Sequence, residues 1–321
     1  MLLDIVTIVI GLAVLAWSAD LFIEGAAGIA TRLGLSPLLI GMTIVSVGTS
    51  APEILVSLMS AATGSGSLAV GNAFGSNIAN VGLVLGLTVL ITPIAVGRTT
   101  AFTDIPILLF IVALCGFLLS DNTLSSSDAV ILSAALLLYL IRMARHQSTS
   151  DNSDLTEQAG AQSALKSGGY FIAGLLLLLV SSRALVFGAV NIATSLGVSE
   201  LIIGLTVVAL GTSLPELAAA LTSALKGHAD IAIGAVVGSN MFNLLIVLAI
   251  PGFFESVNLP SADLYRDLGT VGVSTALMAL FIWFSWSRDS STGHLSRVAG
   301  GSFLLIYVLY YLWLYLGLNT A

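Results

Sequence analysis

The stretch "VSVGTSAPEI", residues 45–54, places a proline and a glutamate inside a long apolar run. A second stretch, "VALGTSLPEL", residues 208–217, repeats it at an offset of 163 residues. Proline removes a backbone N–H, and a charge inside a bilayer is costly. A lone proline is often only a kink, but two copies, each with a glutamate, favour a functional site.

The composition around these stretches is that of a membrane protein. The 321-residue chain is 57% hydrophobic and only 8% charged, whereas soluble proteins average about 25% charged residues. We therefore expect an all-α polytopic membrane protein and no enzyme. The sequence has no basic patch that would indicate nucleic acid as a partner. Its single cysteine, Cys115, allows no internal disulfide. The apolar N-terminus reads as a retained first span rather than as a signal peptide.

Breaks at charged or Gly/Pro/Ser-rich points divide the chain into ten expected membrane spans, each about 20 residues or longer. A polar segment, 146–167, is expected to be a flexible linker between a first five-helix repeat, 1–145, and a second, 168–321. The expected spans are 3–31, 37–62, 67–92, 102–120, 125–145, 168–195, 200–225, 230–254, 266–287 and 296–318.

The cationic residues predict the orientation of these spans. Eight of them lie near the odd-numbered connections, and only Arg266 lies on the opposite side. By the positive-inside rule, the odd-numbered connections and the linker are cytoplasmic, and both termini lie outside. The expected location is the inner or plasma membrane of the cell.

The two halves are related by more than the opening motif. Nearly half of the positions in 33–80 are identical to those in 196–243, without a gap. Because each half has five spans, the halves would enter the membrane from opposite sides. Inverted-topology repeats of this kind are typical of secondary transporters that bind substrate near the midplane.

The motif predicts an oxygen-lined cation site. Pro52 cannot donate to the carbonyl of Gly48, and it should push the preceding Ala51 out of the helical region. Freed carbonyls at membrane depth must line a polar cavity or bind a positive group. Thr49 adds a hydroxyl and Glu53 a carboxylate. Carbonyl, hydroxyl and carboxylate oxygens suit hard cations such as Na⁺ and Ca²⁺.

Several residues near the motif leave alternatives open. Asn77 and its counterpart Asn240 bind either the backbone or an ion. The G-x-x-x-G spacing at Gly71 is by itself more typical of helix packing than of a site. The first repeat has Asn72 where the second has Ala235, and the sequence alone assigns no consequence to the difference.

Two charges lie deep in spans one and six. Asp20 and Arg183 occupy equivalent positions, 163 residues apart. They either pair with one another or extend separately to an interface, and Glu24 competes as a partner.

The paired motifs resemble a known family. "GTSAPE" with "GNAFGSNIAN", repeated as "GTSLPE" with "GAVVGSNMFN", is similar to the two α-repeats of the sodium/calcium exchanger family, within the cation/calcium exchanger superfamily, and is of the prokaryotic type. The resemblance implies antiport of Na⁺ against Ca²⁺ by alternating access, with the ions bound at the midplane between the repeats. It implies no cofactor, and its partners are Ca²⁺, Na⁺ and the lipid bilayer. We expect a monomeric transporter.

The resemblance also assigns roles by matching position. Glu53 and Glu216 would be the central carboxylates shared by both ions. The remaining ion-binding positions would be Thr49, Thr212, Ser46, Ala209, Ser50, Ser213, Ser76, Ser239, Asn80 and Asn243.

One departure from the family pattern changes the charge of the expected site. Many members carry Asp where this chain has Asn243, so Glu53 and Glu216 leave a site charge of −2. That charge balances one Ca²⁺ or two Na⁺ and puts the usual three-to-one stoichiometry in question. Antiport of the same fold coupled to H⁺ or K⁺, or with another divalent cation, is the alternative function. A channel is a further alternative, whereas no P-loop supports an ATP-driven pump.

Overall fold

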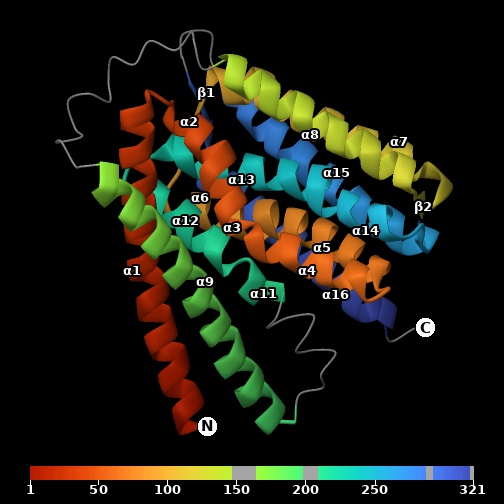
Figure 1. Ribbon diagram of the computed structural model, residues 1–321, viewed down its shortest axis with the longest axis horizontal. Coiled ribbons are helices and arrows are strands. Elements are labelled where there is room, and N and C mark those ends of the chain that lie inside the picture. Colours follow the sequence, from red (N-terminus) through yellow and green to blue (C-terminus); the bar gives the residue numbers. More distant parts are fainter. Residues whose placement is uncertain (147–163, 198–208, 287–291, 319–321) are drawn as a thin grey trace. The chain divides into compact units, whose positions relative to one another are not determined.

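The computed structural model describes residues 1–146, 164–197, 209–286 and 292–318, and these are mostly helical (Figure 1). They form two compact units, each of which combines segments from both halves of the chain. Unit 1 consists of Met1–Pro52 and Gln147–Ala235, and unit 2 consists of Glu53–His146 and Val236–Ala321.

Unit 1 is built around two long helices that lie side by side, α1 and α9 (Figure 1). Gly34, with φ of 64°, ends α1 in a left-handed turn. This turn lets the amide of Leu35 bond back to the carbonyl of Ala30. The elements of unit 1 are α1 (Leu2–Leu33), α2 (Pro37–Ile40), the π-helical segment η1 (Gly41–Val45), α3 (Ser46–Thr49), α9 (Ala164–Ser195), α11 (Ala209–Thr212), α12 (Leu214–Leu225) and the start of α13 (Ala229–Phe242).

Glycines let α1 and α9 approach closely along one seam. A Cβ added at Gly174 would lie 2.5 Å from the backbone nitrogen of Phe22, and one added at Gly188 would lie 2.9 Å from the carbonyl oxygen of Asp4. Small residues that allow such backbone contact are typical of membrane helix pairs. The close pairs along the seam are Gly188 with Asp4 and Ile8, Gly11 with Leu185, Gly174 with Phe22, Gly25 with Phe171 and Gly28 with Ser167.

The seam runs antiparallel and is symmetric. Rising residue numbers in α1 meet falling numbers in α9. The contact of Gly25 with Phe171 is matched by the contact of Gly188 with Ile8, in which the glycine lies 163 residues later and its partner 163 residues earlier. Equivalent residues of the two helices therefore make equivalent contacts.

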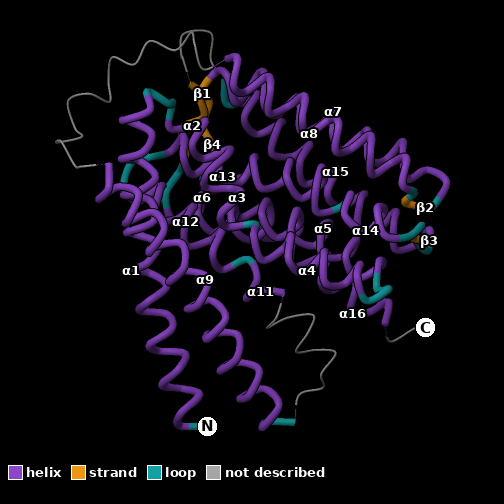
Figure 2. The backbone as a smooth tube through the Cα atoms, viewed as in Figure 1, coloured by secondary structure: helices purple, strands orange, loops and turns teal. Residues whose placement is uncertain are grey.

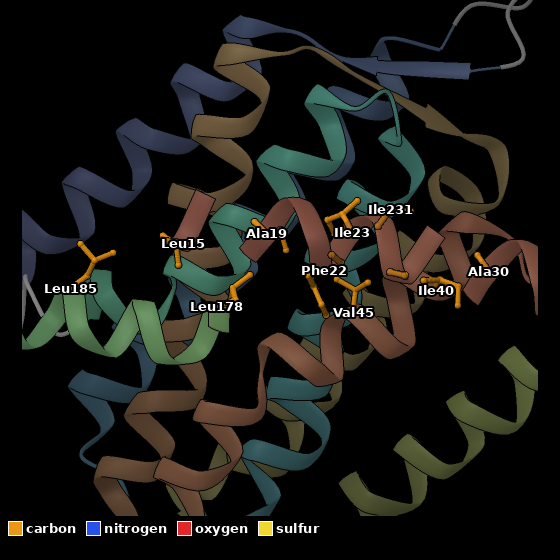
Figure 3. Packing of buried hydrophobic residues seen from close by; sticks show 13 residues of the cluster. Leu15, Ala19, Phe22, Ile23, Ala30, Ile40, Val45, Leu178, Leu185 and Ile231 are labelled. Atoms are coloured by element: carbon orange, nitrogen blue, oxygen red, sulfur yellow. The ribbon is translucent and has the colours of Figure 1, made fainter. Parts of the chain in front are cut away.

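The core of unit 1 is apolar and surrounds this seam (Figure 3). Phe22 and Ile23 of α1 are fully buried, and Leu178 of α9 lies in the same cluster with Ile40 and Val45. The α2–η1 region is thereby joined to the long helix pair.

Unit 2 holds most of the remaining helices. α5 with α6, and α13 with α14, are the two apolar spans least exposed to their surroundings, with 72% and 94% of their most apolar windows buried, against 22–39% in the other long helices. The elements of unit 2 are α4 (Ala51–Ala62, from Glu53 on), α5 (Gly66–Ala79), η2 (Asn80–Leu85), α6 (Gly86–Ile91), β1 (Ile94–Gly97), η3 (Thr100–Asp104), α7 (Ile105–Leu118), η4 (Leu119–Asp121), β2 (Thr123–Leu124), α8 (Ser126–His146), the rest of α13, η7 (Asn243–Val247), α14 (Ala249–Phe254), β3 (Val257–Asn258), α15 (Ser261–Phe284), β4 (Thr292–Leu295) and α16 (Arg297–Leu318).

Two short antiparallel ribbons within unit 2 were not expected from the sequence (Figure 2). β1 pairs with β4, with Ile94 opposite Leu295, and β2 pairs with β3, with Leu124 opposite Val257. Each ribbon joins one strand from each half of the chain. The pairing satisfies backbone groups where the helices end.

The helices match most of the expected spans. Among the described residues, eight helices are long and apolar enough to cross a membrane, or nine when the bent pair Pro37–Thr49 and Ala51–Ala62 counts as one. The expected span 200–225 begins outside the described residues, and only its later part is seen, as α11 and α12. Most of the expected linker, 147–163, also lies outside them, and α9 begins at Ala164.

The pairing of Asp20 with Arg183, one of the two alternatives for these charges, does not form. Asp20 of α1 bonds instead to Lys226, with 2.6 Å between carboxylate Oδ1 and Nζ, and Arg183 is exposed. Lys226 follows the end of α12, which packs against α1, so the lysine reaches the carboxylate across that contact.

Candidate functional site: two helix breaks

The first G-T-S-x-P-E motif breaks its helix at Ser50. Ser50 has φ of −82° and ψ of 5°, and the helical pieces on its two sides, Pro37–Thr49 and Ala51–Ala62, differ in direction by 45°. The expectation that Ala51 leaves the helical region is wrong, since Ala51 already begins α4. The chain absorbs the steric demand of Pro52 one residue earlier, at Ser50.

The second motif breaks at the equivalent residue. Ser213 has φ of −90° and ψ of 1°, and α12 begins at Leu214. The near-identical dihedral angles at Ser50 and Ser213 show that the repeated sequence produces the same local geometry twice.

The carbonyl freed by the second proline already has a partner. Pro215 removes the N–H that would bond to the carbonyl of Gly211. The hydroxyl of Ser182, on α9, donates to that carbonyl oxygen at 2.8 Å. A hydroxyl from a neighbouring helix therefore satisfies this freed carbonyl. At the position equivalent to Ser182 the first half has the buried Ala19, which offers no hydroxyl.

The carbonyl of Ser46 is likewise occupied within its own helix. It accepts from the amide of Ser50 at 2.9 Å and from the hydroxyl of Thr49 at 3.4 Å. The Ser46 hydroxyl bonds to the carbonyl of Gly41, in η1. Thr49 uses its proton in this bond, so the lone pairs of its oxygen remain free to accept or to bind a cation.

Both glutamates lie in the first turn of the helix that follows the break. Glu53 is the third residue of α4 and is 2% exposed, and Glu216 is the third residue of α12 and is 6% exposed. Helix N-termini favour negative charge, so the position suits a carboxylate. Oε2 of Glu53 and the hydroxyl of Ser50 have no hydrogen-bond partner among the described residues. Buried oxygens of this kind call for a cation, a proton or water as a partner.

Unit 2 brings the polar residues of both repeats together. Asn80 begins the π-helical segment η2 and Asn243 begins η7, and α5, which carries Ser76, packs against η7. π-helical turns are rare and occur often at functional sites. Among the described residues, the side-chain nitrogen of Asn80, both side-chain polar atoms of Asn243 and the hydroxyl of Ser239 have no hydrogen-bond partner, although all are buried.

Asn77 and Asn240 differ in their hydrogen bonds. The amide nitrogen of Asn77 donates to the carbonyl of Ala73 at 2.8 Å, whereas its oxygen Oδ1 is buried and has no partner among the described residues. Asn240 is buried, and neither of its side-chain polar atoms has a partner within the described parts of the chain. The symmetric sequence therefore supports two different hydrogen-bonding states.

The remaining predicted residues are placed as follows. Ser213 is buried, and Thr212 is half-buried at the end of α11. Ala209 begins α11, and its side chain lies outside what the structure describes. Sequence reasoning missed Ser182, Ser57 and the role of Asn72. Only the fold could show that these side chains reach main-chain carbonyls of distant segments.

Long apolar helices, together with two equivalent helix breaks that are each followed by a buried glutamate, define a transmembrane secondary transporter as a class. A sequence model of the sodium/calcium exchanger protein family matches residues 3–144 and 166–316. The chain belongs to this family.

Similar proteins cover almost the whole chain. CaxA of Alkalimonas amylolytica is 39% identical over 317 residues, which make up 97% of this chain and 98% of CaxA. Inner membrane protein YrbG of Escherichia coli (strain K12) is 35% identical over 321 residues, and the match covers 97% of this chain and 98% of YrbG. The solved structure of the sodium-calcium exchanger NCX_Mj, soaked with 2.5 mM Na⁺ and 0.1 mM Ca²⁺, superposes on this chain with a TM-score of 0.82 at 30% sequence identity. The match covers 96% of this chain and 97% of the NCX_Mj chain.

Proposed function

We propose that this protein exchanges Na⁺ for Ca²⁺ across the membrane by alternating access. The observation that carries the proposal is the pair of equivalent breaks at Ser50 and Ser213, each followed three residues later by a buried glutamate. Two carboxylates with hydroxyl and amide oxygens form a donor set for hard cations. NCX_Mj, which resembles this chain over nearly its full length, is a sodium-calcium exchanger.

Glu53 and Glu216 are the proposed central ligands for both ions, because they are the carboxylates of the repeated motif. The positions predicted from the sequence around them are the proposed neutral ligands: Ser46, Thr49, Ser50, Ser76, Asn80, Ala209, Thr212, Ser213, Ser239 and Asn243. Ser46 and Ala209 would act through their carbonyls. The Ser46 carbonyl already accepts two bonds, so it must share its lone pairs or release Thr49 when an ion binds.

The proposed architecture is ten spans in two inverted repeats, with both termini outside and the linker in the cytoplasm. The antiparallel, symmetric contacts of α1 and α9 support the inverted relation for that pair of helices. The distribution of lysine and arginine supports the orientation.

The test is a flux assay in proteoliposomes. Vesicles loaded with Na⁺ should accumulate radioactive Ca²⁺ when they are diluted into Na⁺-free medium, and external Na⁺ should abolish the uptake. Ca²⁺ uptake that is indifferent to the Na⁺ gradient would refute the proposal.

The charge count favours one second candidate, coupling to H⁺. Asn at both 80 and 243 leaves two acidic side chains in the proposed site, and two carboxylates can exchange two protons for one Ca²⁺ with simple charge balance. A pH jump applied in the absence of Na⁺ and K⁺ separates the candidates. Only H⁺-coupled exchange would then drive Ca²⁺ uptake.

A further inference from the structure

Two side-chain hydrogen bonds join α4 to other elements of unit 2. The amide nitrogen of Asn72, on α5, donates to the main-chain carbonyl oxygen of Glu53 at 3.1 Å. One turn further on, the hydroxyl of Ser57 donates to the carbonyl oxygen of Val247, in η7, at 2.7 Å. The helix that carries Glu53 is thus held at two levels.

The Ser57 bond repairs a defect in another helix. Pro251 lies four residues after Val247 and has no N–H, so the carbonyl of Val247 loses its helical donor. Ser57 is fully buried and supplies that donor. This bond therefore has a structural purpose, because an unsatisfied buried carbonyl is costly.

The Asn72 bond repairs nothing. The carbonyl of Glu53 lies in the first turn of a regular helix, and the residue four positions later, Ser57, carries an N–H. What the bond does is fix the peptide that follows Glu53. Asn72 precedes Ser76 by four residues, and Ser76 precedes Asn80 by four, so the three lie in one row on their helix face. The donor therefore belongs to the same face as two proposed ligands.

The second half of the chain lacks this donor, because an alanine replaces the asparagine. A Cβ added at Gly41 would lie 2.6 Å from the carbonyl oxygen of Ile231 and 3.1 Å from the backbone nitrogen of Ala235. The backbones of η1 and α13 are thus nearly in contact at Ala235, the position equivalent to Asn72. Among the described residues, a Cβ added at Gly71, beside Asn72, would meet nothing within 4 Å.

We propose that Asn72 is a positioning residue for the Glu53 carboxylate. Its amide holds the first turn of α4 in one orientation, so that Glu53 is presented to the cation without reorganisation. The inference rests on the proposed role of Glu53 in ion binding. Loss of the amide should weaken Ca²⁺ more than Na⁺, because the attraction between carboxylate and ion grows with the charge of the ion.

The experiment compares Asn72→Ala and Asn72→Leu with Ser57→Ala and Glu53→Gln. Leucine keeps nearly the shape of asparagine without its amide, so it preserves the packing if alanine impairs folding. Na⁺-driven Ca²⁺ uptake in proteoliposomes gives KM and Vmax, calorimetry on the purified protein gives Ca²⁺ affinity, and thermal unfolding gives Tm.

Both Asn72 variants should raise the KM and the Kd for Ca²⁺ by about five- to tenfold, with Vmax within about twofold of the wild type. Ser57→Ala should lower Tm but leave KM unchanged, because its bond does not touch the Glu53 peptide. Glu53→Gln should lose uptake.

Wild-type KM and Kd in both Asn72 variants, alongside inactive Glu53→Gln, would overturn the role of Asn72 and leave the proposed function standing. An equal rise of KM in Ser57→Ala would also overturn it, since general loosening of α4 would then explain the effect. If the wild type shows no Na⁺-driven uptake, the proposed function fails instead, and the calorimetric Kd of Asn72→Leu still decides the inference.

Discussion

The two helix breaks share every fixed residue of the G-T-S-x-P-E motif and nearly the same backbone angles, yet different neighbours hold them. At the second break, Ser182 donates to the carbonyl that Pro215 frees, whereas the first half has Ala19 at that position. At the first break, Asn72 donates to the carbonyl of Glu53, whereas the second half has Ala235.

The comparison teaches that a repeated motif fixes its own backbone but not its hydrogen-bond partners. The two copies of the motif occupy different surroundings, as their different donors show. Donors that differ between the halves therefore mark where the symmetry is broken.

The largest effect is expected at the feature that the breaks share. Glu53→Gln and Glu216→Gln should each reduce Ca²⁺ uptake by about 100-fold or more, because a buried ion would lose a charged ligand. Uptake of radioactive Ca²⁺ into Na⁺-loaded vesicles measures it. The matched control is Glu255→Gln, at an exposed loop position, which should behave as the wild type. Retained uptake in either motif variant would remove that glutamate from the site.

A smaller effect is expected from the partner that only the second break has. Ser182→Ala leaves the carbonyl of Gly211 without its hydroxyl donor and should lower the free energy of unfolding by about 1–3 kcal/mol. Thermal unfolding in detergent measures the loss. The control is Ser181→Ala on the same helix, where the hydroxyl bonds only to the carbonyl of Leu178 in its own turn. Equal losses in the two variants would show that the Gly211 bond is not special.

The repair of the Val247 carbonyl can be isolated with a double-mutant cycle. Ser57→Ala alone should cost about 1–2 kcal/mol, whereas the same change in a Pro251→Ala background should cost clearly less, because an alanine at that position restores the helical N–H. Chemical unfolding of the four proteins measures the coupling. Additive losses would contradict the compensation between Ser57 and Pro251.

The smallest effect is expected at Lys226, far from the shared motif. Burial, and then the charge of Lys226, hold the pKa of His228 below its usual value. Lys226→Met should raise that pKa toward the usual value without reaching it, since burial remains. Loss of the half-exposed bond to Asp20 should cost at most about 1 kcal/mol. NMR titration of the His228 imidazole checks the direction, and an unchanged or lower pKa would contradict it.

The same histidine gives a sign for pH dependence. A pKa that is lower in the folded than in the unfolded protein means that the unfolded state binds the proton more readily. His228 should therefore reduce stability as pH falls through its unfolded pKa, near 6.5. Lys226→Met should make that loss smaller.

Local features of the fold could be predicted from the sequence because they depend on local chemistry. The helix covering 37–62 breaks where proline demands it, within one residue, and the apolar runs match the long helices. Partners that depend on tertiary packing could not be predicted. The sequence offered Asp20, with Glu24 as a competitor, as the partner of Arg183, and the structure pairs Asp20 with Lys226. The sequence likewise does not show that Ser182 contacts the second break, because that contact depends on the packing of α9 against α11.

The glycine seam of α1 and α9 has a consequence for the origin of the chain. Its contacts repeat under exchange of the two helices, which is the rule for an isologous interface between identical subunits. The contacts of Gly25 with Phe171 and of Gly188 with Ile8 are those that a dimer of a single ancestral half would make. The two halves, produced as separate polypeptides divided between α8 and α9, should therefore still recognise one another through this seam.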